Sequence, residues 1–525
     1  MSSDKNTSAE LPDNIDALKA LVVDKSAEAE HYKNRLSALE EQIRLMRHKQ
    51  FGSSSEKGNE QQDNLFNEAE LEALGNGDED SPVAEAIDKD DRQTTETKKP
   101  RGHRQPLPAS LPRIRVEHDI SDTDKVCDCG CQMDRIGEDI SEQLDIVPAK
   151  IQVIQNVRFK YACKVCEAGV KTTPLPPQPI PKSNASAGLL AHICTAKFMD
   201  ALPLHRQEKI FARLNIHLPR ATLARWMIRS SQLAQPLLNL LHDHINAYDI
   251  QHMDETRIQV LNEKDRPATS QSQIWVQKGG PPDQPATCYH YDPARSREVA
   301  VRLLDGFSGY LQTDGYAVYK KLAPSMTQMG CWAHVRRKFD EAVKAQPKGK
   351  KAGKAQMGLS QIQKLYAIEK RIADKPAGER QQIRQQLARP VIDKLRVWLL
   401  KSMDTVTPGS KAGQALTYLN NQWPSLLHYL NDGRLTIDNN VAENAIRPFV
   451  IGRKNWLFAD TPAGAGASAN LYSLIETARA NDLEPYHYLR HIFKELPKAQ
   501  TVEEVEALLP FNIDRARLND WARHE

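Results

Sequence analysis

The sequence predicts a multidomain α/β protein whose central domain is a mixed sheet interrupted by a helical insertion. Two observations lead to this fold class. Between residues 246 and 344, segments of strand composition are followed by helical patterns, with short connections between them. Residues 345–430 are helical in pattern, and the helix that completes the sheet domain, within 431–484, comes only after them.

Each element of the central domain is predicted from its own pattern. Segments rich in β-branched and aromatic residues are expected to form strands at 250–261, 272–279, 286–292, 309–316 and 326–332. Helical periodicity indicates helices over 294–306 and 333–344. We expect the order β-β-β-α-β-α-β-α, which is the ribonuclease H-like, or retroviral-integrase-like, arrangement.

Residues 1–57 carry a heptad pattern that predicts a coiled coil, or leucine zipper. The a and d positions are Ile15, Leu18, Val22, Lys25, Ala29, Tyr32, Leu36, Leu39, Ile43 and Met46. One amphipathic helix packed on its own protein would give the same pattern. Because a polar linker follows directly, we expect a homo-oligomer, a dimer or higher.

Charge is unevenly distributed along the chain. Residues 58–97 hold 13 acidic and 2 basic residues and lack periodicity, so we expect a disordered linker over 58–109. This linker ends in a basic strip, KKPRGHRQPLP (98–108). Residues 98–525 hold 60 basic and 45 acidic residues, a net charge of +15 that is typical of nucleic-acid binding.

Five of the eight cysteines form two tight groups within residues 110–172, which predicts a zinc-binding module. Cys163 and Cys166 form a CxxC pair, and the other group is Cys127, Cys129 and Cys131. Four of these five thiols would complete a structural Zn²⁺ site, but the spacing does not decide which four. Ordinary reduced thiols are the alternative. A proline-rich hinge, 173–185, follows.

Residues 186–245 are helical in pattern and are compatible with a helix-turn-helix. Helices are expected over 205–215 and 221–234, with Thr222 capping the second. Arg225, on that second helix, is a candidate DNA contact. Paired helices that pack only on each other are an equally good interpretation of this pattern.

No apolar run approaches the roughly 20 residues that a membrane helix needs. The N-terminal residues are polar and lack the apolar segment of a signal peptide. We therefore expect no membrane contact and a cytoplasmic location.

Three carboxylates are candidates for binding Mg²⁺ or Mn²⁺. Asp254 lies within the first predicted strand and Asp314 at the end of the fourth, and these strands are neighbours in the expected fold. Glu443 lies on the last helix of the domain. Two metal ions held by such a set can catalyse phosphodiester displacement. The alternative is ordinary, because any large protein has aspartates in strands and glutamates in helices.

Several segments around these carboxylates resemble one known family. They are FGSSSEK (51–57), GEDISEQLDIVPAKIQVIQNVRFKYACKVCE (137–167), DET (254–256), TDGY (313–316), GCWAHVRRKF (330–339) and NNVAENAIRPFVIGRKNWLFA (439–459). Together they resemble DDE transposases of the insertion-sequence-66 family, from about residue 15 to the C-terminus. The resemblance implies that Asp254, Asp314 and Glu443 are the catalytic residues.

The resemblance also implies zinc at the cysteine region, a helical C-terminal element over 485–525 and possible accessory proteins from the same element. The expected partners are DNA, as terminal inverted repeats and as target. Candidate DNA contacts besides Arg225 are Arg336, Arg337, Arg447, Arg453, Lys454 and Asn455. His334 is a catalytic or a structural residue, Trp456 stacks on a base or belongs to the core, and Asn439 and Asn440 cap or orient the helix of Glu443.

Two other functions remain open from the sequence. Another nuclease of the same fold would use the same carboxylates without strand transfer. A DNA-binding regulator would use only the zinc and helical modules, and would leave the three carboxylates unexplained. The zipper, the zinc module and the paired helices favour a transposase, because they suit the binding and pairing of DNA ends.

Overall fold

The structure is a computed structural model that describes residues 14–51, 151–162, 170–319, 322–347, 353–515 and 518. The chain forms two compact units, of which one comprises Met1–Asp78 and Pro176–Glu525 and the other Glu79–Leu175. In the second unit, β1 (Lys160–Ala162) and β2 (Val170–Thr172) form an antiparallel hairpin. The predicted acidic linker and all five cysteines of the predicted zinc site lie outside the described residues.

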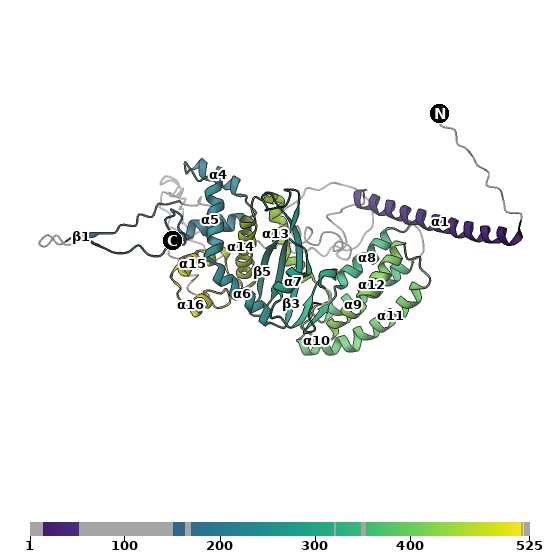
Figure 1. The fold of residues 1–525 in the computed structure, drawn as a ribbon. Coiled ribbons are helices and arrows are strands. Elements are labelled where there is room, and N and C mark those ends of the chain that lie inside the picture. The colour runs from purple at the N-terminus through teal and green to yellow at the C-terminus, as the bar shows by residue number, and fades with distance from the viewer. Residues whose placement is uncertain are drawn as a thin grey trace, which may run out of the picture. The chain divides into compact units, whose positions relative to one another are not determined.

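A mixed sheet of six strands forms the centre of the first unit (Figure 1). The strands are β3 (Ile250–Val260), β4 (Gln271–Gly279), β5 (Ala286–Asp292), β6 (Gly309–Gln312), β7 (Met326–Met329) and β8 (Phe458–Ala459). Their order is β5-β4-β3-β6-β7, and β8 pairs with β3. The pairs among β3, β4 and β5 are antiparallel, whereas β3 pairs in parallel with β6 and with β8, and β6 with β7. The five strands expected from the sequence are therefore present.

One connection differs from the expected order. Between β6 and β7 the described residues form a 3-10 turn, η2 (Ala317–Tyr319), where the order β-β-β-α-β-α-β-α has a helix. The segment between these strands contains Gly315, which has a positive φ, and Pro324, and both residues disfavour a regular helix. Helix α7 (Arg297–Leu303) joins β5 to β6 as expected and packs with η2 over Met253 and Trp275.

The other face of the sheet is covered by α13 (Asn440–Trp456) and α14 (Pro462–Ala480). Helix α14 lies along the edge strand β5, whose outer N–H groups lack a partner strand. The N–H of Thr287 donates to Thr477 Oγ1 at 3.1 Å, and that of Tyr289 donates to Ser473 Oγ at 2.8 Å. These hydroxyls satisfy backbone groups that burial would otherwise leave unpaired.

Two sets of helices, one before the sheet in the sequence and one after it, share one core with this face. They are α3 (Ala187–Phe198), α4 (Leu204–Arg213), α5 (Arg220–Leu233), α6 (Gln235–Ala247), α15 (Pro485–Glu495) and α16 (Val502–Glu506). Helix α15 packs against α3. Helix α5 begins directly after Pro219, its N-cap residue, and has no side-chain cap. Thr222 lies inside the helix, so the expected cap at Thr222 is wrong. The ring of Pro219 instead fixes the φ angle of the residue from which the helix starts.

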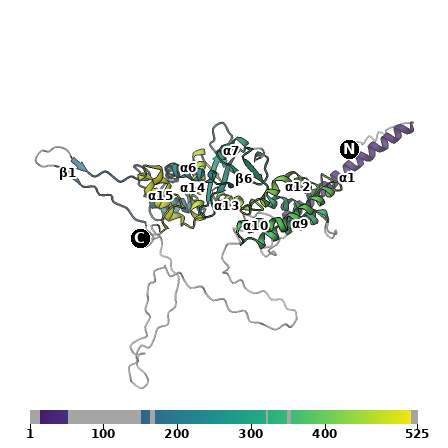
Figure 2. The ribbon, with the colours of Figure 1, turned by 90° about the horizontal axis from the view of Figure 1, so that it is seen from below.

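The predicted insertion is helical and has a core of its own (Figure 2). Its helices are α9 (Lys354–Arg371), α10 (Ala377–Ile383), the π-helical turn η3 (Arg384–Ala388), α11 (Arg389–Met403) and α12 (Lys411–Leu427). Helix α8 (Trp332–Lys344), which follows β7, packs its Trp332, Val335 and Phe339 into this core. The insertion is therefore anchored on a helix that the sheet domain supplies.

The N-terminal residues form one helix, α1 (Ile15–Phe51), as the heptad pattern predicts. Its apolar side chains are mostly exposed, with Leu36 at 60% and Leu39 at 50%. Near its C-terminal end Leu45 is buried, and Arg44 Nε donates to the carbonyl of Ala345 at 2.8 Å. None of the described helices is long and apolar enough to cross a membrane.

Candidate active site

The register of two parallel strands brings Asp254 and Asp314 to the same level of the sheet. His252 on β3 pairs with Gln312 on β6, and each aspartate lies two residues further along its chain. Side chains alternate along a strand, so His252 and Asp254 share one face of β3. Asp314 follows the end of β6, where its Oδ1 accepts the backbone N–H of Tyr316 at 2.8 Å.

Helix α13 delivers Glu443 to the same face of the sheet. Asn439, just before the helix, donates from Nδ2 to the carbonyl of Met253 at 3.0 Å, and its Oδ1 lies 3.3 Å from His252 Nδ1. Its side chain makes no capping hydrogen bond to α13. Of the two expected roles for Asn439, the structure therefore shows orientation: it fixes the helix against β3 one turn ahead of Glu443.

The electrostatics show that these carboxylates act on one another. The pKa of Asp254 is raised well above its usual range, first by burial and then by the charges of Glu255, Asp314 and Glu443. Negative charge gathered at one partly buried place is unfavourable unless a cation neutralises it. The donor set, oxygen atoms of carboxylates, fits the hard cations Mg²⁺ and Mn²⁺.

Glu255 is a site residue that the sequence argument missed. It points to the opposite face of β3 from Asp254, and its side chain is only 1% exposed. Arg295 Nε donates to Glu255 Oε1 at 2.8 Å, and the hydroxyl of Tyr319 donates to the other carboxylate oxygen. Burial raises the pKa of Glu255, while the hydrogen bonds from Tyr319 and Arg295 oppose this shift. Glu255 is thus a buried, paired carboxylate next to the candidate catalytic one.

Cys331 and His334, which flank the start of α8, lie beside Glu443. The ligand atoms of these three residues all lie within 4.8 Å of one another, and His334 Nδ1 is 3.8 Å from Glu443 Oε1. Burial and the charge of Arg337 lower the pKa of His334 to about 4, so its imidazole is neutral at neutral pH. His334 therefore lies beside Glu443 as a neutral imidazole, close enough for the two residues to share a cation.

The other predicted DNA contacts are distributed over several surfaces. Arg453 is half-buried rather than open: its Nη1 donates to Thr256 Oγ1 on β3 at 3.2 Å, and burial lowers its pKa. Lys454 and Asn455 are exposed on the last turn of α13, and Arg225 is exposed on α5. Arg336 and Arg337 line a cavity beside α9.

Two further side chains on α13 are candidate site residues: Arg447 as a DNA contact, and Trp456 as either a base-stacking or a core residue. Arg447 donates to Asn444 Oδ1 at 3.0 Å, within its own helix. The Trp456 ring is partly buried and meets Phe449 edge to face, with 5.4 Å between ring centroids. This places Trp456 against the core, which is the structural one of its two expected roles.

Comparison with known families covers most of the chain. A family model described as "Transposase IS66 family" matches residues 182–467, which include all three candidate carboxylates. The zinc-finger binding domain of the same family matches residues 124–167, which include all five clustered cysteines. The C-terminal element of the family matches residues 473–511. A model described as "Transposase C of IS166 homeodomain" matches residues 38–116.

Full-length relatives are similar over much of their length. Uncharacterized protein y4jD of Sinorhizobium fredii is 35% identical over 422 residues, covering 77% of this chain and 81% of that protein. Uncharacterized protein y4qI of the same organism is 28% identical over 541 residues, covering 96% and 98%. The family match spans more than half of the chain and contains the carboxylates that the fold brings together, and on this basis the chain belongs to the IS66 family of transposases.

Proposed function

We propose that this transposase binds the terminal inverted repeats of its insertion sequence and catalyses metal-dependent cleavage and transfer of DNA strands. One observation carries the proposal. The β3–β6 register and the docking of α13 bring Asp254, Asp314 and Glu443 close enough for their charges to interact. In the proposed reaction, water exposes a 3′-hydroxyl at the element end, and that hydroxyl then attacks target DNA.

The sheet that holds these residues is, in this proposal, a ribonuclease H-like catalytic core. Its three antiparallel strands, its parallel strands β6 and β7, and its carboxylates on adjacent central strands support this assignment. The short connection at η2 is a local departure from it. Helices α8 and α13 then flank the site from the insertion side and from the sheet side.

Asp254, Asp314 and Glu443 would hold two Mg²⁺ or Mn²⁺ ions. When bound, such ions lower the cost of negative charge on the attacking and leaving oxygens. The chain itself contributes position: Asn439 fixes α13 on β3, and Tyr316 holds one oxygen of Asp314 through its backbone N–H. Preorganised groups of this kind reduce the rearrangement that the reaction requires.

The basic body of the chain would hold the DNA. Lys454 and Asn455, the two residues directly after Arg453, are exposed on the helix that carries Glu443. Arginine and lysine side chains bind backbone phosphates without reading sequence, so their contacts fix the position of the DNA and make affinity depend on salt. Arg225 on α5 is the proposed contact of the paired helices.

Pairing of the two element ends would need more than one copy of the chain. Helix α1 supplies a surface through which copies could associate. Heptad side chains such as Leu36 and Leu39 are exposed along one 37-residue helix. We assign these residues to a zipper between copies. A structural Zn²⁺ ion would be held by four of the five cysteines within 124–167. We also propose that accessory proteins encoded by the same element take part, and that the transposase acts in the cytoplasm.

The proposal is tested by incubating the purified chain with labelled element ends, target DNA and Mg²⁺. Strand-transfer products joined to target DNA are the expected result. Nicked ends without transfer would show another nuclease of the same fold, and binding without any cleavage would show a regulator. Either outcome contradicts the proposal.

A further inference from the structure

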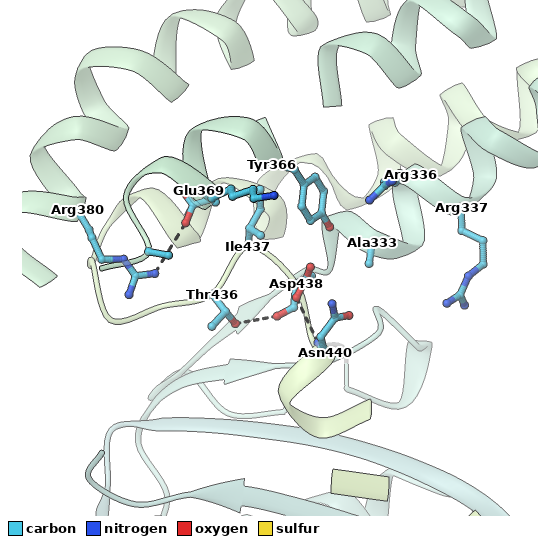
Figure 3. A pocket seen from close by; sticks show the side chains of 12 residues that line it. Ala333, Arg336, Arg337, Tyr366, Glu369, Arg380, Thr436, Ile437, Asp438 and Asn440 are labelled. Carbon is cyan, nitrogen blue, oxygen red and sulfur yellow. Dashed lines mark hydrogen bonds and ion pairs between the residues drawn. The ribbon is translucent and has the colours of Figure 1, made fainter. Parts of the chain in front are cut away.

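A cavity of about 440 Å³ lies between the insertion and the segment that leads into α13 (Figure 3). Its walls come from α8, α9, α10 and residues 436–440. Four basic side chains line it: Arg336, Arg337, Lys370 and Arg380. The walls therefore combine residues that are distant in the sequence and belong to both the insertion and the sheet domain.

The balance of charge in the cavity is positive. Its two carboxylates are Glu369 and Asp438. The charge of Glu369 is already neutralised by Arg384, which does not line the cavity. The fully buried Arg384 side chain donates to Glu369 from Nε at 2.9 Å and from Nη2 at 2.7 Å. Arg380, at 3.8 Å from Glu369, is only a second and more distant partner. The lining cations thus exceed the negative charge available to them.

Buried donors in the cavity lack partners among the described residues. Arg336 Nε and Arg380 Nε are both buried and make no hydrogen bond to that part of the chain. Burial and the nearby charge of Arg384 lower the pKa of Arg380, and the charge of Glu369 opposes this shift only in part. Native proteins rarely leave buried polar atoms without a partner, so two such nitrogens in one cavity point to an absent acceptor.

Aromatic packing keeps one of these donors in place. The Arg336 guanidinium carbon lies 5.3 Å from the centroid of the Tyr366 ring, and Figure 3 shows the two side chains next to each other at the top of the cavity. The Tyr366 hydroxyl lies close to Asp438 but makes no well-formed hydrogen bond. A guanidinium group held against a ring is preorganised for an anion, because little side-chain freedom is lost on binding.

We propose that this cavity binds a phosphate group of a DNA strand that enters the catalytic site, an inference that rests on the proposed function. Phosphate oxygens are the acceptors that arginine donors suit best. Asn440, which lines the cavity, is the first residue of α13 and precedes Glu443 by three positions. A strand whose phosphate occupies the cavity would therefore pass beside the candidate carboxylates. The volume also leaves room for an attached sugar.

The first test uses inorganic phosphate as the probe and the thermal midpoint of the intact chain as the readout. Phosphate replaces chloride at constant ionic strength. We expect phosphate to raise the midpoint of the parent and to have a much smaller effect on Arg380→Gln and Lys370→Gln. Arg389→Gln is the matched control, since Arg389 is exposed on α11 and pairs with Asp393, four positions later on the same helix. It should respond as the parent does.

Two features keep this test interpretable. Glu369 keeps its pairing to Arg384 when Arg380 is replaced, so the fold should survive. Lys370 is exposed, and its replacement should not disturb folding. No phosphate effect on the parent, or an equal effect on the parent and Arg380→Gln, would overturn the proposed phosphate site.

The second test identifies the source of the phosphate. Element-end DNA is prepared with single neutral methylphosphonate linkages, moved one position at a time. At one or two positions near the cut, the neutral linkage should weaken parental binding several-fold and leave Arg380→Gln binding unchanged. Equal losses in both proteins at every position would overturn the DNA assignment. If the parent binds but does not cleave, catalysis fails while the phosphate site stands.

Discussion

The guanidinium group of Arg295 lies 3.9 Å from the centroid of the Tyr316 ring and also donates hydrogen bonds to Glu255. Glu255 directly follows Asp254, and the N–H of Tyr316 donates to Asp314. One arginine, just ahead of α7, therefore connects the two segments that carry the paired aspartates. We infer that this contact sets the distance between Asp254 and Asp314.

Replacing Arg295 by lysine should slow strand cleavage by about tenfold or more, which corresponds to a barrier increase of about 1.4 kcal/mol. Lysine keeps the charge but cannot both stack on Tyr316 and donate a forked pair of hydrogen bonds. The Mg²⁺ concentration for half-maximal rate should also rise, while DNA affinity stays unchanged. Arg302→Lys, on the far end of α7, is the control. Equal rates and equal Mg²⁺ dependence in both variants would remove this role.

Replacing Asp254 by asparagine should stabilise the metal-free protein. Because its folded pKa is raised, Asp254 binds its proton more tightly in the folded than in the unfolded chain. This carboxyl therefore lowers stability as pH rises above its unfolded pKa of about 3.9, and costs most once pH exceeds the folded pKa. Asparagine carries no charge and keeps the oxygen that accepts the N–H of Glu255.

Thermal unfolding near neutral pH, without divalent cations, measures this effect. The Asp254→Asn midpoint should rise by a few degrees, since about 1 kcal/mol corresponds to roughly 2–4 °C in a domain of about 150–250 residues. Added Mg²⁺ should then stabilise the parent more than the variant. Asp305→Asn, which replaces an exposed aspartate, controls for charge removal. A variant less stable than the parent at every pH would contradict the account of Asp254.

The zipper prediction concerns the apolar stripe of α1. Introducing aspartate at both Leu36 and Leu39 would bury charge in a helical interface, which costs several kcal/mol through desolvation. Light scattering should show a lower mass for this double variant. Lys33→Asp with Ser37→Asp changes exposed positions off the stripe and should keep the parental mass. If all three proteins have the same mass, α1 does not hold copies together.

The zinc prediction concerns the CxxC pair. Cys163→Ser should lower zinc content and destabilise the region 110–172, because metal binding and local folding are coupled. Cys288, a free cysteine buried on β5, supplies the control, and Cys288→Ser should keep its zinc. Metal analysis of the intact, carefully purified chain is the measurement. An absence of zinc from the parent would end this prediction.

Local patterns were enough to predict most elements of the sheet domain and the insertion. Strand alternation around Asp254 and the helical period around Glu443 depend on neighbours in sequence, and both elements lie where expected. Local patterns alone did not predict that the three carboxylates lie close together. That prediction also needed the expected strand order. The helix of the heptad pattern is likewise confirmed, while its pairing with a second copy stays a prediction.

Features that depend on distant partners could not be predicted. The role of Glu255 rests on Arg295, 40 positions later, and on Tyr319, so its own neighbours gave no signal. The DNA contact of Arg453 stays a prediction, but its hydrogen bond to Thr256 of β3, 197 positions away, gave no signal in the sequence. The cavity at Arg336 and Arg380 exists only because the insertion folds back onto the start of α13.

The most direct test of the central claim compares Glu443→Gln with Glu506→Gln, an exposed glutamate on α16. Binding of element ends and their Mg²⁺-dependent cleavage are measured side by side for both variants. Glutamine keeps the size of the side chain and removes the charge that would hold a cation, so Glu443→Gln should bind ends normally and fail to cleave them. Glu506→Gln should do both at parental rates. Near-parental cleavage by Glu443→Gln would show that this glutamate is not a catalytic metal ligand.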